Sequence, residues 1–343
     1  MRMRSIASAL LFFSCGALGL RAQVTWYGAT DLYWSTPSNW SPNDNNATLT
    51  SGTADVIFNN YSSVSSLVDQ AYTINSLTVG NYAGTLSNSG GGTLNVISNF
   101  TDSSANAVLV EVPLSGTMAL NVSGTGTLTL NVGTNSFANT YYGNTVVTAG
   151  ALADASAYSF SYNSQLLVGL GGRVNVNFPE QVLSLSDYYA GSGGSVVIAQ
   201  YATLFINGDY SPTFSGVISG LGNLEKDGSS SQILTGANTY TGTTVVGLGA
   251  SLQLGDGITA GSLLSPSVSG SGSLVFDSPT TTSYSGVLSG ALGVANWGGH
   301  DHAIWDKHLF RSNLSPGRYA DSRFYERLRR CNGCKRRNGK WNT

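Results

Sequence analysis

The sequence predicts an all-β chain that folds as a parallel β-helix, or β-solenoid, with a cap at its N-terminus. Three observations lead to this prediction: a phrase of residues recurs along the chain, apolar side chains alternate with polar ones, and small residues recur before the alternating segments. A repeated phrase indicates stacked units that bury their apolar sides only against their neighbours. The pattern therefore favours an elongated structural protein over an enzyme with a deep pocket.

The composition agrees with a chain that folds. Of the 343 residues, 41% are hydrophobic and 10% are charged, so the low charge does not indicate disorder. The formal net charge is −2. This charge is too small to indicate a nucleic-acid partner or attraction to an acidic membrane surface.

The repeated phrase is clearest between residues 214 and 255. Its opening, Phe214-Ser-Gly-Val-Ile-Ser-Gly220, returns as Tyr284-Ser-Gly-Val-Leu-Ser-Gly290. Its central part at 236–246, which contains Asn-Thr-Tyr, returns at 139–147. These echoes predict that residues 61–290 form the β-helix repeats.

Short segments alternate with the period of two that is typical of half-buried strands. The residues expected on the buried sides of two such strands are Leu128, Leu130 and Val132, and Val174, Val176 and Phe178. Small residues precede strands at Gly92, Gly116, Gly126, Gly172, Gly194, Gly222, Ala250 and Gly272. Several intervals between them are 22 to 28 residues, which is the length of one coil of three short strands and three turns.

The residue pattern of the repeat resembles that of a known family. Gly-x-Leu-x-Lys-x-Gly, then Leu-Thr-Gly-Ala-Asn-Thr-Tyr-Thr-Gly-x-Thr-x-Val, then Ala-x-Leu-Gln-Leu-Gly, resembles the autotransporter-associated β-strand repeat of bacterial surface proteins. The match is strong over 214–257 and partial over 124–152 and 284–290. The resemblance implies a right-handed parallel β-helix in an exported, surface-associated passenger. It implies no catalytic residue, because the repeat carries structural ones.

Residues 1–22 are predicted to be a signal peptide that is cleaved after Ala22. Two arginines precede an apolar stretch from Ile6 to Leu20, as in export signals. A retained anchoring helix and lipidation at Cys15 are the alternatives. The apolar stretch of about 15 residues is shorter than the ~20 needed to cross a membrane, so no transmembrane span is expected in the mature chain.

Residues 23–60 are predicted to form the cap. This segment is rich in tryptophan and departs from the repeat, and a β-helix needs an atypical terminal unit because its open end exposes unpaired backbone. We expect Trp26, Trp34 and Trp40 to form the core of the cap. An aromatic platform for sugars is the competing interpretation.

Residues 291–343 are predicted to be an atypical basic tail that is either frameshifted or disordered. Eleven of the sixteen lysines and arginines lie after residue 299, as do all three histidines. The Asn-Thr-Tyr group that should follow Tyr284 by one repeat is missing, and Lys307-His308 stands in its place. Read one nucleotide forward, Trp297 to Ser312 permits codons for Gly-Gly-Gly-Thr-Thr-Thr-Leu-Ser-Gly-Thr-Asn-Thr-Phe-Ser-Gly, which is the missing repeat.

No catalytic, cofactor-binding or metal-binding residue is assigned from the sequence, and no cofactor is expected. No histidine precedes residue 300, so the repeats cannot hold a Ser-His-Asp set. The carboxylates that could meet on neighbouring coils, as a glycoside hydrolase requires, are Asp209, Glu225, Asp227, Asp256 and Asp277. Lys226 and Asp227 are expected to be solvated turn residues.

Two groups in the tail have other chemistry. His300, His302, Cys331 and Cys334 are residue types that bind zinc, but their spacing matches no finger pattern. The basic run 327–337 would attract phosphates by charge alone. A frameshifted tail would give both groups no function.

The function expected from these observations is that of an exported bacterial cell-surface structural or adhesin-like β-helix passenger without catalysis. The alternatives are a carbohydrate-active β-helix that cleaves polysaccharides and a non-catalytic glycan-binding module. The expected partner is an unidentified surface ligand, either a glycan or a host or neighbouring cell. The expected location is secreted, or on the cell surface or outer membrane.

Resequencing the gene across the codons for residues 291–298 tests the frameshift. Trp297-Gly298-Gly299 must be encoded by TGG-GGN-GGN, a guanine-rich run. We expect this run to be miscounted or mutated, and the shifted frame after it to spell the missing repeat. If the run is confirmed and the codons of the shifted frame do not spell Leu-Ser-Gly-Thr-Asn-Thr-Phe-Ser-Gly, the frameshift hypothesis is wrong.

Overall fold

The computed structural model describes residues 21–43, 47–62, 65–133, 138–280 and 283–297, together with 336–337 and 340–341. Residues 1–20 of the predicted signal peptide and most of the predicted tail lie outside the described residues. The chain divides into two compact units, residues 1–304 and 305–343. In the second unit the structure describes an antiparallel pair of strands, β30 (Arg336–Arg337) and β31 (Lys340–Trp341).

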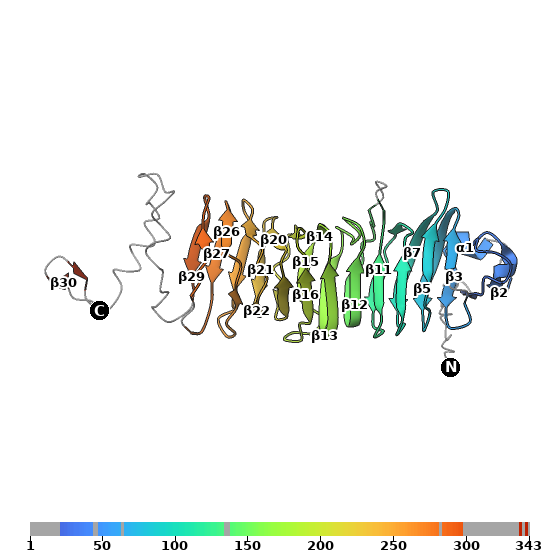
Figure 1. Ribbon diagram of the computed structural model, residues 1–343, viewed down its shortest axis with the longest axis horizontal. Coiled ribbons are helices and arrows are strands. Elements are labelled where there is room, and N and C mark those ends of the chain that lie inside the picture. The colour runs from blue at the N-terminus through green and yellow to red at the C-terminus, as the bar shows by residue number, and fades with distance from the viewer. Residues whose placement is uncertain are drawn as a thin grey trace, which may run out of the picture. The chain divides into compact units, whose positions relative to one another are not determined.

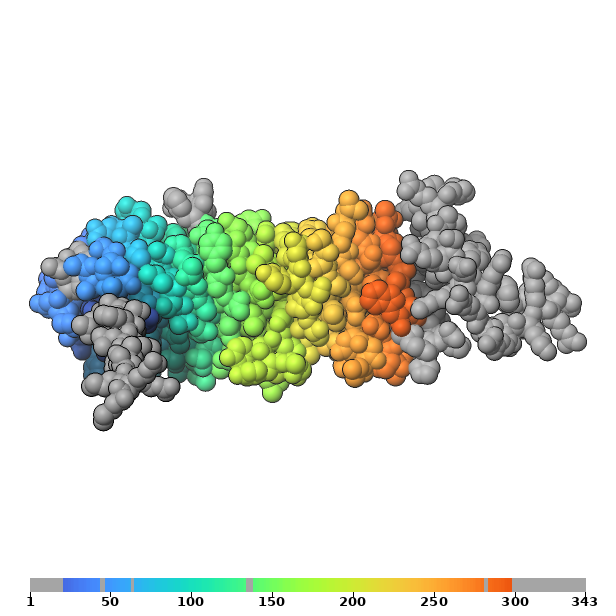
Figure 2. All heavy atoms as spheres, turned by 180° about the vertical axis from the view of Figure 1, so that it is seen from behind, coloured from blue at the N-terminus to red at the C-terminus, as the bar shows by residue number. Residues whose placement is uncertain are grey.

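The first unit is a parallel β-helix of about 11 turns, with 49% strand and 3% helix. The all-β class and the solenoid predicted from the repeats are therefore confirmed. Successive coils lie side by side along the long axis of the unit, from the blue N-terminal strands to the orange β29 (Gly293–Asn296) (Figure 1). The space-filling view shows the described part of this unit as a continuous rod without a side domain (Figure 2).

Each coil crosses three faces in the same order. The first face holds β1 (Ala22–Trp26), β3 (Ala54–Phe58), β10 (Ala119–Val122), β15 (Ser184–Asp187), β18 (Thr213–Phe214), β21 (Ser231–Leu234), β24 (Ser251–Leu254), β27 (Ser273–Phe276) and β29. The second face holds β4 (Ser65–Val68), β6 (Thr85–Asn88), β8 (Ala107–Val110), β11 (Thr127–Leu130), β16 (Ser195–Ile198), β19 (Val217–Gly220), β22 (Ala237–Asn238) and β25 (Ser262–Leu263).

The third face holds β9 (Leu114–Ser115), β14 (Glu180–Val182), β17 (Thr203–Ile206), β20 (Asn223–Lys226), β23 (Thr244–Val246), β26 (Ser267–Gly270) and β28 (Val287–Leu288). Four long strands bend across a corner and serve two faces. They are β5 (Ala71–Val79) and β7 (Thr93–Asp102), which join the third face to the first, and β12 (Thr145–Asp154) and β13 (Gln165–Val176), which join the first face to the second.

The alternation of side chains builds an apolar column inside the solenoid. Parallel register aligns buried residues of successive second-face strands: Val108, Leu128, Leu152, Val174, Val196 and Ile218. Each of these side chains is buried, and full burial of such a side chain stabilises a fold by roughly 1.5–3 kcal/mol. The core is therefore continuous along the rod, and each coil depends on its two neighbours for burial.

Corners between strands bring the backbones of neighbouring coils into contact, which explains the recurring small residues. A Cβ atom on Gly126 would lie 1.9 Å from the carbonyl oxygen of Asn106 in the preceding coil, and only glycine avoids this clash.

The coil length predicted from the spacing of these small residues needs correction. Gly222 precedes a strand of the third face, whereas Ala250 precedes a strand of the first face, so the interval between them is not one coil. Paired residues such as Gln165 and Ser184 are as few as 19 apart.

The cap seals the N-terminal end with three indole rings, as predicted. Trp26, Trp34 and Trp40 are at most 2% exposed, and the Trp40 ring centroid lies 5.0 Å from that of Trp26 and 5.1 Å from that of Trp34. Trp26 also stacks on Phe58 of the first complete coil, with 6.0 Å between centroids. Because all three rings are inside, the alternative of a sugar platform is wrong for these tryptophans. Short elements around them are η1 (Pro37–Asn39), β2 (Trp40–Ser41) and α1 (Ala47–Ser51).

The Asn-Thr-Tyr group of the repeat joins three consecutive coils. Asn238 is buried, and its Oδ1 accepts the backbone N–H of Ile218 in the preceding coil at 3.0 Å. Its Nδ2 donates to the carbonyl oxygen of Ser262 in the following coil at 3.0 Å. Asn139 makes the equivalent bonds, with the N–H of Leu114 at 2.7 Å and the carbonyl oxygen of Ser159.

The tyrosine and threonine of the same group form a second link. The Tyr240 hydroxyl lies 2.6 Å from Thr244 Oγ1, which donates to Ser265 Oγ in the following coil at 2.9 Å. Tyr141 and Thr145 repeat this contact at 2.7 Å. The recurrence of the phrase thus follows from polar side chains that must be satisfied inside the core.

Replacing Asn238 by alanine is expected to lower the free energy of unfolding by about 2–4 kcal/mol, because it leaves a buried N–H and buried carbonyl groups without partners. Chemical denaturation followed by circular dichroism measures the change. The control is Asn88→Ala, at an exposed position, which should change the stability by less than about 0.5 kcal/mol. Equal effects of the two substitutions would contradict the bridging role of Asn238.

Candidate functional site

Most carboxylates considered from the sequence have structural partners and do not converge on a site. Asp209 Oδ1 accepts the N–H and the hydroxyl of Ser229, at 3.0 and 2.8 Å, and so joins two neighbouring coils. Asp256 Oδ1 accepts the N–H groups of Ile258 and Thr259, at 3.0 and 2.6 Å. The bonds of Asp256 are typical of an acidic residue that stabilises a turn.

Three other carboxylates considered from the sequence have similar structural partners. Asp277 accepts the side-chain amide of Gln253 at 3.3 Å. Glu225 hydrogen-bonds to Asp227, and partial burial, followed by the charge of Asp227, raises the pKa of Glu225. In the part of the chain that the structure describes, no three His, Cys, Asp or Glu residues lie close enough to hold a metal ion. His300, His302, Cys331 and Cys334 lie outside that part.

The expectation that Lys226 is a solvated turn residue is wrong. Its side chain is 1% exposed, because it occupies the inward phase at the end of β20. The ammonium group donates to the carbonyl oxygens of Gly208, at 3.2 Å, and of Asp227. Burial lowers the pKa of Lys226, and the nearby carboxylates of Asp227 and Asp209 oppose this effect. The lysine of the repeat therefore joins the corner that follows β20 to the preceding coil through these two carbonyl groups.

The third face of the solenoid is interrupted between β9 and β14. Among the described residues from 116 to 179, all strands belong to the first or second face, and β14 opens a separate six-stranded sheet. In the two intervening coils, residues 139–141 and 159–161 cross this face without a strand. Backbone N–H groups in this region therefore need partners other than a ladder of strands.

A pair of buried carboxyl groups supplies some of these partners. Glu180 is 0% exposed and accepts the N–H groups of Ser159 and Phe160, both at 2.8 Å. Asp154 is 2% exposed and accepts the N–H groups of Asn177 and Phe178, at 2.6 and 2.7 Å. Because each carboxyl group binds the backbone of the other's coil, the pair clasps two coils together. We call Asp154 and Glu180 the carboxyl clasp.

Glu180 of the clasp is protonated at neutral pH. Burial raises the pKa of both groups, and that of Glu180 reaches about 9, with the neighbouring Asp154 carboxylate as a further cause. A hydrogen bond joins the two side chains. Glu180 is thus the protonated member, since two close carboxylates in a low-dielectric site cannot both be ionised. The backbone N–H groups that face both carboxyl groups favour the charged forms and partly oppose the effect of burial on the two pKa values.

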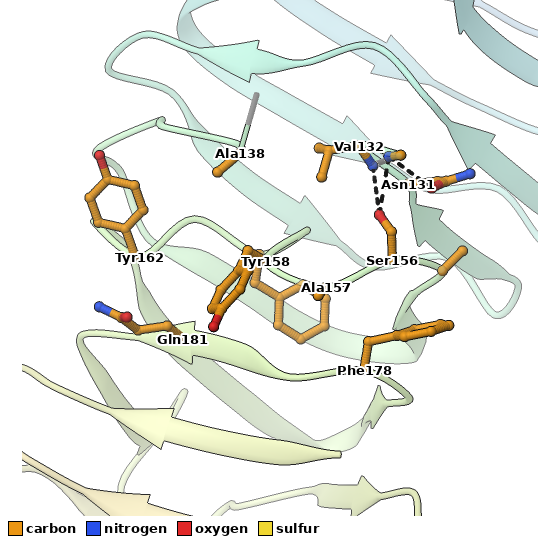
Figure 3. A pocket seen from close by; sticks show the side chains of 12 residues that line it. Asn131, Val132, Ala138, Ser156, Ala157, Tyr158, Tyr162, Phe178 and Gln181 are labelled. Carbon is orange, nitrogen blue, oxygen red and sulfur yellow. Dashed lines mark hydrogen bonds between the residues drawn. The ribbon is translucent and has the colours of Figure 1, made fainter. Parts of the chain in front are cut away.

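A groove of about 750 Å³ opens beside the clasp, where the third face is interrupted. Its wall holds the aromatic residues Tyr158, Phe160, Tyr162 and Phe178, the amides of Asn131 and Gln181, and several small residues. Figure 3 shows the Tyr158 ring in the middle, with Tyr162 and Gln181 on one side and Phe178 on the other. The rings of Tyr158, Tyr162 and Phe178 are 50%, 43% and 43% exposed.

The polar groups of the groove differ in their partners. Ser156 Oγ accepts the N–H groups of Val132 and Gly133, at 3.1 and 3.2 Å (Figure 3). The side chains of Tyr158, Tyr162 and Gln181 make no hydrogen bond within the described residues. None of the described residues that line the groove is charged. The groove therefore presents exposed rings and neutral donors and acceptors that have no partner among the residues that the structure describes.

The sequence did not indicate this groove. Phe178 was expected inside, in phase with Val174 and Val176, but it is exposed because the chain turns after β13 to bring the Phe178 N–H to Asp154. The prediction for Phe178 is therefore wrong, whereas Val174, Val176 and the three residues of the other strand are buried as expected. One signal was present: Asp154 follows Leu152 in the buried phase of its strand, where an acidic residue needs a partner.

The chain is similar to part of a known protein. A stretch of 135 residues is 38% identical to the adhesin BmaC autotransporter of Brucella suis biovar 1, and the match covers 38% of this chain and 4% of the adhesin. The chain thus corresponds to a small part of that protein. No family model matches the chain, and no solved structure matches it.

The similarity and the fold agree with each other. The chain is a β-solenoid of the kind found in autotransporter passengers, and it resembles part of an autotransporter adhesin. Among the described residues, no helix has the length and apolar character needed to cross a membrane.

The clasp predicts that stability falls as pH rises. The ordinary pKa of a glutamic acid is 4.5 and that of folded Glu180 is about 9, so between these values the folded state holds a proton that the unfolded state has released. The stabilisation is complete below the unfolded pKa and is lost as pH rises through about 9. Asp102, whose pKa burial raises to about 6, adds to the trend at lower pH.

Thermal unfolding measured from pH 5 to pH 9 is therefore expected to give the highest melting temperature at pH 5. Glu180→Gln removes the titrating group and should flatten the decline above pH 6. It should also lower the melting temperature at pH 5, because an amide has one acceptor oxygen for two N–H groups. A variant that declines as steeply as the wild type above pH 6 would show that Glu180 is not the source.

Proposed function

We propose that the chain is part of an exported bacterial cell-surface passenger, a structural and adhesin-like β-helix without catalysis of its own. The observation that carries the proposal is the 38% identity over 135 residues to an autotransporter adhesin, in a chain that forms a β-solenoid. The expected route is cleavage of the signal peptide at 1–22 and exposure outside the cell. The expected partner is a ligand on a host or neighbouring cell.

The architecture supports a role in display. Each coil adds about 4.8 Å to the length of a solenoid, so stacked coils carry their outer side chains far from an attachment point. Exposed aromatic side chains recur on the surface, for example Tyr61, Tyr142 and Tyr189, at 71%, 69% and 69% exposure. Exposed tyrosines suit binding, because they offer a large rigid contact area together with a hydroxyl group.

The carboxylates support the expectation of no catalysis. A glycoside hydrolase uses two carboxyl groups that reach the glycosidic bond. Asp154 and Glu180 are a close pair with raised pKa values, but they are at most 2% exposed and bind backbone N–H groups. Their position behind the groove wall fits a structural function. The hydrolase alternative gains no support from this arrangement.

Beads coated with the purified full chain test the proposal. We expect such beads to be retained on epithelial or bacterial cell layers several-fold more than beads coated with the heat-unfolded chain, and soluble chain should compete with them. The same preparation should release no reducing ends from polysaccharides. Retention equal to that of the unfolded control on every layer would contradict the adhesin-like function, and released sugar would contradict the absence of catalysis.

A further inference from the structure

We propose that the groove lined by Tyr158, Tyr162, Phe178 and Gln181 binds a short neutral glycan. The inference rests on the adhesin-like function proposed above and names the chemical class of its ligand. It also assigns the binding to one place, the interruption of the third face between β9 and β14.

The first support is the arrangement of the rings. Tyr158, Tyr162 and Phe178 come from two neighbouring coils, and each keeps about half of its surface exposed within one groove. In Figure 3 the Tyr158 ring lies between Tyr162 and Phe178. Hexose rings have an apolar face of C–H groups that packs on aromatic faces, so a row of separate, accessible rings suits successive sugar units.

The second support is the backbone at Tyr158. Its φ is 58°, in the left-handed region that costs an L-residue other than glycine roughly 1–2 kcal/mol. In the preceding coil the same groove is lined by Gly133, which has φ 68° and bears no such cost. A tyrosine therefore occupies a position where glycine would fold more easily, and strain of this kind is typical of functional sites.

The third support is the set of unpaired polar groups. The phenol groups of Tyr158 and Tyr162 and the amide of Gln181 have no side-chain partner within the described residues. Together they offer donors and acceptors on both sides of the central ring, as Figure 3 shows for Tyr162 and Gln181. Sugar hydroxyl groups can pair with all three, whereas a purely apolar ligand would leave them unpaired.

The charge of the groove favours a neutral ligand. No lysine, arginine, aspartate or glutamate is among the described residues that line it. The acidic groups of the carboxyl clasp face backbone N–H groups, and Glu111 accepts the amide of Asn131 at 3.4 Å. Sialic acid and sulfate groups are negatively charged, and no cationic side chain among the described lining residues would stabilise them in the groove.

The size of the groove favours a small ligand. Its volume of about 750 Å³ lies within the range of 300–1,000 Å³ that is usual for small-molecule sites. A short oligosaccharide fits this range, whereas a folded protein partner would need a larger surface. The inaccessible clasp explains why the glycan would be held without being cleaved.

An array of neutral, sialylated and sulfated oligosaccharides probed with the full chain tests the inference. We expect binding to neutral structures only. The best neutral oligosaccharide is then immobilised, and the dissociation constant is measured for variants. Tyr158→Gly and Gln181→Ala should each weaken binding about tenfold or more.

The matched control is Tyr201→Gly. Tyr201 is also an exposed tyrosine with a left-handed backbone, at φ 70°, but it does not line the groove. Both glycine variants should melt within about 3 °C of the wild type or above it, since each relieves strain. Binding by Tyr201→Gly should stay within twofold of the wild type. Binding by Tyr158→Gly that equals the wild type would overturn the inference.

The two proposals fail in different ways. If coated beads adhere to cells but no neutral oligosaccharide binds, the groove is not a glycan site and the adhesin-like function stands. Capture of a peptide or of charged glycans alone would likewise overturn the inference. If a neutral oligosaccharide binds through Tyr158 but beads adhere to no cell layer, the groove is confirmed and the adhesin-like function fails.

Discussion

The fold depends on one constraint: each coil must leave no buried backbone group unpaired against the coils on either side. Parallel ladders meet this requirement along the strands, and corners meet it by other means. Glycine lets the backbones approach where Gly126 meets Asn106. Asn238 replaces ladder bonds by accepting from Ile218 and donating to Ser262. The residues of the repeated phrase are therefore those that complete the backbone hydrogen bonding where strands end.

This constraint also explains how far the sequence could be interpreted. The fold was predictable because the same requirement recurs from coil to coil and is met by the same residue types, as Asn-Thr-Tyr shows at 139–141 and again at 238–240. The phase of the coils was not predictable, because every corner demands a small residue and Gly222 and Ala250 mark different faces. The predictions for Lys226 and Phe178 were wrong for a related reason: Lys226 is buried instead of exposed, and Phe178 is exposed instead of buried. Alternation defines inside and outside only while a strand is straight, and both residues lie next to corners.

The carboxyl clasp was beyond prediction because it depends on register between coils. Asp154 and Glu180 are far apart in sequence, and their meeting requires that β12, β13 and β14 take their observed offsets. Once the strands are in register, each carboxyl group provides the hydrogen-bonding partner that the other, buried group needs. Glu180 gives Asp154 a proton to bind, and both give partners to N–H groups that no strand reaches. A buried acidic residue in an alternating strand was the visible sign, but its partner could be found only in three dimensions.

The same interruption of the third face accounts for both the clasp and the groove. Where a strand is absent, the corner residues turn outward, and the face loses the flat row of side chains that covers the core elsewhere. Glu180 keeps the backbone satisfied on the inner side, so that Tyr158 and Phe178 can stay exposed on the outer side. Tyr158 accepts a left-handed backbone in this position, and the paired coils on either side are what hold it there. In a solenoid, a break in one face can thus be tolerated locally, because the other two faces continue the ladder past it.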